Sequence, residues 1–124
     1  SYYKNWAKDC HTIIKKIREK ISILKRKNAI IGYGAAAKAN TFLNFSKIKL
    51  DYVIDDNKFK QNKFCPGSKI PIKSGELLRK IQKNIYVMPL AWNFYKEIKS
   101  KVKKINPNKN DKFILCFPNF KIEK

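Results

Sequence analysis

The chain has 124 residues, an apolar fraction of 44% and a formal net charge of +20. This length is enough for one domain with a hydrophobic core and excludes two independent ones, and the apolar fraction excludes a disordered tail. Only Arg18, Arg26 and Arg79 are arginines among 29 basic residues. Because arginine is the usual partner of bases and phosphates, the composition favours a solvated lysine surface over a nucleic-acid-binding one.

Three cysteines, Cys10, Cys65 and Cys116, are odd in number and widely spaced. This spacing predicts neither a disulfide framework nor a zinc knuckle, so we expect free thiols and no metal site. The N-terminus has no secretory signal pattern, and no apolar run approaches the roughly 18 residues that cross a bilayer. We therefore expect a cytoplasmic protein that does not bind membranes.

The first segment has an amphipathic helical pattern. Its apolar residues recur at steps of three and four, at Trp6, Cys10, Ile13, Ile17, Ile21 and Leu24. Lysines and glutamates fill the opposite side, which predicts a long amphipathic linker or covering helix within residues 1–27.

A strand, a glycine turn and a second helix follow. Residues 28–32 form a short apolar run that ends in glycine, as a strand buried on both faces does. Residues 35–45 are rich in alanine and have helical spacing, and residues 50–55 form another β-rich run. The order predicts a β-α-β unit with parallel strands.

The remaining segments continue this alternation. We expect a polar loop over 56–68, a short extended edge segment over 69–72, a helix from Ser74 to Ile81 capped by Ser74, a strand over 84–90, a helix over 92–105, a strand over 112–117 and a frayed tail over 119–124. Alternating strands and helices predict a Rossmann-like, three-layer α/β sandwich with about four parallel strands over residues 28–118.

The glycine turn has the strongest signal for binding. Gly32-x-Gly34-x-x-Ala37 fits the G-x-G-x-x-G/A fingerprint and stands between a strand and a helix, where its mechanism requires it. We expect Gly32 to permit the tight turn and Gly34 to let a phosphate approach the backbone. The N–H groups from Ala35 to Ala37 would then face an anion at the helix N-terminus.

Two acids and one lysine extend this hypothesis. Asp55 or Asp56 ends the second strand a little over twenty residues after Gly32, where such folds place an acid on a ribose hydroxyl. Lys38 could add a point charge to the same anion. By contrast, His11 stands apart from any acid or nucleophile, and the sequence contains no catalytic constellation, so it favours a binding domain.

Four ordered blocks of residues resemble a known family. They are Gly32-Tyr33-Gly34-Ala35-Ala36-Ala37-Lys38-Ala39-Asn40-Thr41, Asp55-Asp56-Asn57-x-x-Lys60-Gln61, Pro66-Gly67-x-x-Ile70-Pro71-Ile72 and Leu90-Ala91-Trp92-Asn93-Phe94. Together they resemble the C-terminal domain of bacterial S-adenosylmethionine-dependent sugar C-methyltransferases, from about residue 30 to residue 117.

The resemblance implies a division of labour. In that family a zinc-binding segment and a methyl-donor domain precede a Rossmann-like domain that helps to hold a nucleotide-linked sugar. This chain resembles only that last domain, so S-adenosylmethionine would bind to a covalently preceding domain. The resemblance implies no catalytic residue and no cofactor in this chain.

The resemblance also implies a set of substrate-binding residues at the carboxyl edge of the sheet. Gly34, Lys38, Asn40 and Thr41 would face the diphosphate, Asp55, Asp56 and Asn57 would approach the nucleoside, Trp92 and Asn93 would line the same edge, and Gly32, Tyr33 and Ala35 would complete the loop.

Two other hypotheses stay open. The glycine fingerprint and Asp55 alone also fit a stand-alone dinucleotide- or coenzyme-binding regulatory module. The charge of +20 also fits a basic nucleic-acid-binding domain, whose affinity would fall steeply with salt.

Overall fold

A mostly parallel sheet forms the centre of the molecule. The computed structural model describes residues 2–107, 110–116 and 120–124, with side chains from residue 8 onward. Its sheet has six strands in the order β3-β2-β1-β4-β5-β6. The strands are β1 (Asn28–Tyr33), β2 (Tyr52–Ile54), β3 (Ile72–Lys73), β4 (Asn84–Pro89), β5 (Lys112–Leu115) and β6 (Lys121–Glu123). All neighbours pair in parallel except β5 and β6.

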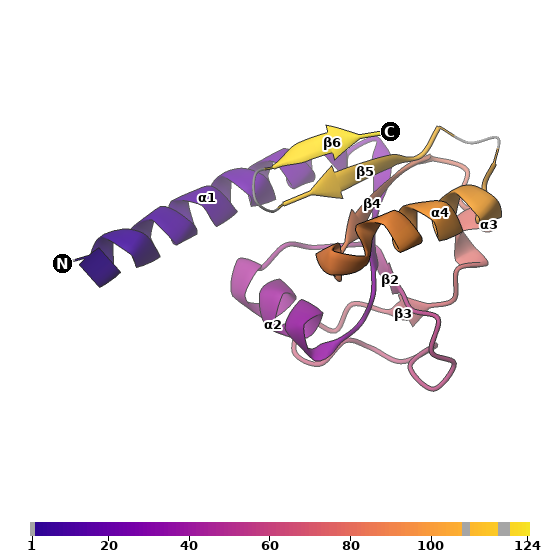
Figure 1. Ribbon diagram of the computed structural model, residues 1–124, viewed down its shortest axis with the longest axis horizontal. Coiled ribbons are helices and arrows are strands. Elements are labelled where there is room, and N and C mark those ends of the chain that lie inside the picture. The colour runs from indigo at the N-terminus through magenta and orange to yellow at the C-terminus, as the bar shows by residue number, and fades with distance from the viewer. Residues whose placement is uncertain (1, 108–109, 117–119) are drawn as a thin grey trace.

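Helices cover both faces of this sheet (Figure 1). They are α1 (Tyr2–Leu24), α2 (Ala37–Ser46), α3 (Leu77–Lys80), the 3₁₀ turn η1 (Trp92–Phe94) and α4 (Tyr95–Ile105). Residues of α1 and α2 pack in one hydrophobic cluster, and residues of α3 and α4 pack in a second one. The predicted three-layer α/β sandwich is therefore confirmed, with five parallel strands where about four were expected.

Strand β1 separates the two clusters. Ile30 belongs to the α1/α2 cluster, whereas its neighbours Ala29 and Ile31 belong to the α3/α4 cluster. Successive side chains of a strand point to opposite faces, so a strand covered on both faces is apolar throughout. This explains why the run Ala29-Ile30-Ile31 shows no alternation of polar and apolar residues.

The long first helix is confirmed, but its buried side differs from the prediction. Ile14, Ile17 and Ile21 are buried, whereas Ile13 is 56% exposed. The stripe that faces the sheet therefore runs through Ile14, and placing Ile13 on it was wrong. Trp6 belongs to the part of α1 whose side chains are not described. The N-terminal end of α1 extends past the rest of the molecule (Figure 1).

Three local predictions need correction. The segment predicted as a frayed tail contains β6, which pairs antiparallel to β5 through Ile114 and Ile122. The helix expected from Ser74 to Ile81 is the shorter α3, and no side chain caps it. The backbone of Ser74 instead closes a turn by accepting a hydrogen bond from Leu77 N–H at 3.1 Å. The predicted end of the last strand at Phe117 lies outside the described residues.

The edge position predicted for the Pro71 segment is confirmed. β3 is the outermost strand of the sheet and pairs with β2 through Val53 and Ile72. Its outer side bonds to the preceding loop, since Ile72 N–H donates to Lys63 O at 2.8 Å. Among the residues that the structure describes, no helix is both long and apolar enough to cross a membrane.

The connections on the two sides of β1 define where a site can form. The chain leaves β1 through α2 to reach β2 on one side, and β4 flanks β1 on the other. Such a switch point opens a crevice at the carboxyl ends of the strands, where open α/β sheets bind their ligands.

Candidate functional site

The glycine loop links the end of β1 to the start of α2. Gly34 has a φ of +102°, a conformation that side chains disfavour, and its N–H donates to Ile54 O at 2.7 Å. Gly32 lies inside β1, so the prediction that Gly32 permits the tight turn was wrong. A Cβ on Gly32 would meet Leu50 and Leu90 Cδ1 at 2.8 Å. Gly32 therefore makes room for packing, and Gly34 makes the turn.

The N-terminus of α2 has no side-chain cap. Its N-cap residue Ala36 is extended, with φ −84° and ψ 170°, and no side chain hydrogen-bonds to the first turn. The first N–H groups of a helix have no partner within the helix, and the helix dipole adds partial positive charge there. Ala36, Ala37 and Lys38 are all exposed. This end of α2 is therefore a favourable place for an anion.

A cavity of about 420 Å³ opens beside this helix end. The residues that line it come from two segments: Ala36, Ala37, Lys38 and Ala39 at the start of α2, and Leu90, Ala91, Trp92, Asn93 and Phe94 after β4. The walls are mostly apolar, with Lys38 and Asn93 as polar side chains. A ligand with one anionic group and one flat apolar group would match this lining.

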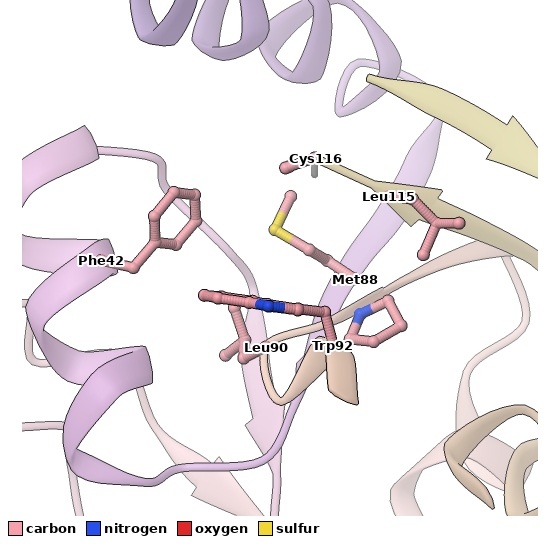
Figure 2. Close-up of a pocket in the computed structure, with 7 residues that line it drawn as sticks. Phe42, Met88, Leu90, Trp92, Leu115 and Cys116 are labelled. Atoms are coloured by element: carbon pink, nitrogen blue, oxygen red, sulfur yellow. The ribbon is translucent and has the colours of Figure 1, made fainter. Parts of the chain in front are cut away.

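Leu90 and Trp92 line both this cavity and a smaller apolar one. Figure 2 shows Phe42 reaching from α2 towards Trp92 and Met88, with Leu115 and Cys116 completing the far side. The smaller cavity measures only about 10 Å³, which holds at most one water molecule. Burial raises the pKa of the Cys116 thiol to about 11, so the thiol stays protonated and is a poor nucleophile. This apolar wall packs against Trp92.

Asp55 is bound to the glycine loop and to its own turn. Its Oδ2 accepts the Ala35 N–H at 2.7 Å, and its Oδ1 accepts the Asn57 N–H at 2.8 Å. The Ala35 N–H is therefore taken, and the expectation that this group faces an anion was wrong. Only the N–H groups that follow it in the chain are left for a ligand at the α2 terminus.

Asp56 lies on the α4 side of the loop. It accepts hydrogen bonds from Tyr33 Oη at 2.8 Å and from Lys101 Nζ at 2.7 Å. Burial alone would raise the pKa of the Asp56 carboxyl, but these two bonds outweigh it and lower that pKa below its ordinary value. Burial and the bond to Asp56 raise the pKa of the Tyr33 hydroxyl, which stays protonated.

A second hollow, of about 180 Å³, lies on this side of Gly34. Its lining includes Asp55, Asp56 and Phe94, and Phe94 also lines the large cavity. Two carboxylates disfavour a phosphate, so the two hollows differ in charge: the α2 side suits an anion and the acid side suits a neutral group that bears hydroxyl or N–H donors.

The structure brings most of the predicted site residues to one edge of the sheet, but not all of them line a cavity. Lys38, Trp92 and Asn93 line the large cavity. Thr41 Oγ1 donates to Ala37 O at 3.1 Å within its own helix, and Asn40 Oδ1 is buried without a hydrogen-bond partner. Asn57 caps its own loop through the Phe59 N–H, at 2.9 Å.

Sequence reasoning did not select Phe94, Lys60 and Lys101. Phe94 is 59% exposed and lines both hollows. The sequence predicted one regular helix over 92–105, whereas Trp92–Phe94 form the 3₁₀ turn η1, in which Phe94 is exposed. Lys60 belongs to one of the blocks that resemble the family, but its position in the sequence did not predict its hydrogen bond to the glycine loop. Among the described residues, no group of three or more His, Cys, Asp or Glu side chains could hold a metal ion.

The fold and this edge define a Rossmann-like domain with a cavity at the switch point of its sheet. Residues 1–118 match the family described as C-methyltransferase C-terminal domain, and the chain belongs to that family. The C-methyltransferase NovU of Streptomyces niveus is 29% identical over 120 residues, which cover 94% of this chain and 28% of that protein. The chain therefore spans little more than a quarter of this curated relative.

Proposed function

We propose that this domain binds a nucleotide-linked sugar and holds it for C-methylation by a preceding domain of the same protein. S-adenosylmethionine would bind to that other domain, and the protein would work in the cytoplasm. The whole activity rests on family membership, because the chain covers only part of its relative. In this proposal the domain contributes by holding and orienting the substrate.

One observation carries the proposal: the uncapped N-terminus of α2 opens on the 420 Å³ cavity. The diphosphate would lie against this terminus, with Lys38 as a mobile positive charge. A flat base would lie on the exposed aromatic rings of Trp92 and Phe94, which are 41% and 59% exposed. The ribose or sugar hydroxyls would lie towards the hollow with Asp55 and Asp56.

A coenzyme-binding module receives less support. That hypothesis rests on the glycine fingerprint and Asp55 alone, whereas the family match over residues 1–118 favours a methyltransferase domain. Nucleic-acid binding has the net charge in its favour and no other observation. Titrations with nicotinamide cofactors and with DNA at two salt concentrations distinguish both from the proposed function.

The variant Ala36→Asp tests the proposal directly. A carboxylate at the N-cap should hydrogen-bond the free N–H groups of α2 and raise the free energy of unfolding by about 0.5–2 kcal/mol. The same carboxylate should repel a diphosphate and weaken nucleoside diphosphate binding at least about tenfold. Chemical denaturation measures the first effect, and NMR titration of the chain measures the second.

The control Asn84→Asp adds the same charge at the amino end of β4, where Asn84 is exposed. It should leave binding nearly unchanged. Equal losses in both variants would reveal an effect of net charge alone, and absence of binding to the wild-type chain at millimolar nucleoside diphosphate would overturn the proposal.

A further inference from the structure

The glycine loop is held by the segment Asp55–Gln61, which follows β2. Ala35 is only 4% exposed, and both of its backbone polar groups bond to this segment. Its N–H donates to Asp55 Oδ2 at 2.7 Å, and its carbonyl accepts from Lys60 Nζ at 3.0 Å. A buried backbone thus takes its two partners from charged side chains, which form stronger hydrogen bonds than neutral groups do.

The segment is itself fixed by internal hydrogen bonds. Asp55 O accepts from Gln61 Nε2 at 2.9 Å, and Asp55 Oδ1 accepts the Asn57 N–H at 2.8 Å. Asn57 O accepts the Lys60 N–H at 3.0 Å. The backbone of Lys60 is therefore already held in a turn, so little backbone entropy remains to be lost when its ammonium group binds the glycine loop.

The hydrogen bond from Lys60 to the Ala35 carbonyl also fixes the direction of the N–H group in the same peptide unit. A peptide unit is planar and trans, so its C=O and N–H point in opposite directions. The Ala35 carbonyl shares its peptide unit with the Ala36 N–H. When Lys60 binds the carbonyl, the Ala36 N–H points away from Lys60, and Ala36 lines the large cavity. The ammonium charge also polarises this peptide and makes its N–H a better donor.

We propose that Lys60 is a positioning residue that orients the Ala36 N–H at the start of α2 for the anion of the ligand. This inference rests on the proposed function, since the anion is the one assigned there. Lys60 acts through the peptide group and needs no contact with the ligand. The block Asp55-Asp56-Asn57-x-x-Lys60-Gln61 is then a device that holds the glycine loop in its binding shape.

The experiment compares Lys60→Gln with Lys58→Gln in the 124-residue chain. Both remove one positive charge from the same segment, and Lys58 is exposed. Lys60→Gln should weaken nucleoside diphosphate binding about fivefold to twentyfold, whereas Lys58→Gln should change it less than twofold. Affinity for the nucleoside without phosphate should stay the same in both variants, which a general loss of structure would not allow. Lys60→Arg, which keeps the charge and a donor, should recover most of the affinity.

A second measurement needs no ligand. The amide NMR signal of Ala36 should shift in Lys60→Gln and stay in place in Lys58→Gln. If the wild-type chain binds and Lys60→Gln binds equally well, the inference is wrong while the proposed function stands. If the wild-type chain does not bind, the proposed function fails, and with it the assigned anion; an unmoved Ala36 signal would then also disprove the orientation by Lys60.

Discussion

The two glycines of the fingerprint perform different tasks in this protein. Gly34 has the positive φ and makes the turn, whereas Gly32 leaves space for the side chains of Leu50 and Leu90. The sequence shows the same residue type at both positions and cannot separate conformation from packing. Only the positions of the neighbouring side chains reveal which requirement applies to which glycine.

Asp56 provides a prediction at the residue scale. Its pKa is lowered in the folded chain, so its carboxylate stabilises the fold above its ordinary pKa of 3.8, and this contribution is lost as the pH falls through the lowered value. Asp56→Asn should lower the free energy of unfolding by about 0.5–1 kcal/mol near neutral pH, since the pair with Lys101 is half exposed. The difference from wild type should shrink towards zero at about pH 2, as measured by urea denaturation at several pH values.

Asp9→Asn is the control, because Asp9 is exposed on α1. This substitution changes the net charge by the same amount as Asp56→Asn. A loss of stability in Asp9→Asn as large as that in Asp56→Asn would attribute the effect to net charge. A difference for Asp56→Asn that stays constant down to pH 2 would contradict the assigned titration.

At the scale of elements, the two ends of α2 differ in how they are closed. The N-terminus has no side-chain cap and faces the cavity. The C-terminus ends on Lys47 in the left-handed conformation, with φ 58°, and its N–H donates to Leu43 O at 3.1 Å. Glycine adopts this conformation without the steric cost that lysine incurs, so the C-terminus is less stable than it could be.

Lys47→Gly should therefore stabilise the chain. We expect a gain of about 0.5–1 kcal/mol, after the greater freedom of glycine in the unfolded chain is subtracted. Thermal unfolding measures it. Lys49→Gly replaces an exposed lysine that lacks a positive φ, and it should destabilise the chain. A loss of stability in both variants would mean that the left-handed conformation of Lys47 costs nothing.

Across the whole molecule, α1 packs into the same hydrophobic core as one face of the sheet. Ile17 and Ile21 pack in one cluster with Ile30 of β1 and Leu43 of α2. Arg18 Nη1 donates to the carbonyl of the fully buried Ser46 at 2.7 Å and ties α1 to the end of α2. The helix over residues 1–27, expected as a linker or covering helix, covers one face of the domain.

Two isoleucines of α1 test this statement. Ile21 is 2% exposed and Ile13 is 56% exposed. Ile21→Ala should lower the free energy of unfolding by about 2–5 kcal/mol, because it leaves a cavity in the core. Ile13→Ala should change it by less than about 0.5 kcal/mol. Equal and small effects, measured by denaturant unfolding, would mean that α1 is detached from the cooperative core.

The sequence alone predicted the alternation of strands and helices up to β5 and the parallel sheet, and it pointed to the glycine loop as the candidate site. It did so because buried parallel strands are apolar throughout, amphipathic helices have a period of 3.6, and a glycine turn between them requires particular residues. The edge position of the Pro71 segment followed from the missing N–H of proline.

Only the tertiary structure decided which side chains hold the loop and which line the cavity. Asp55 and Lys60 bind Ala35 across 20 and 25 positions of the chain, respectively. Asp56 accepts hydrogen bonds from Tyr33 and Lys101, which belong to two other segments. Such contacts depend on register and on packing between elements, which local spacing does not encode. For the same reason the sequence predicted that Asp55 contacts a ligand, whereas in the folded chain its carboxylate accepts hydrogen bonds from the protein's own backbone.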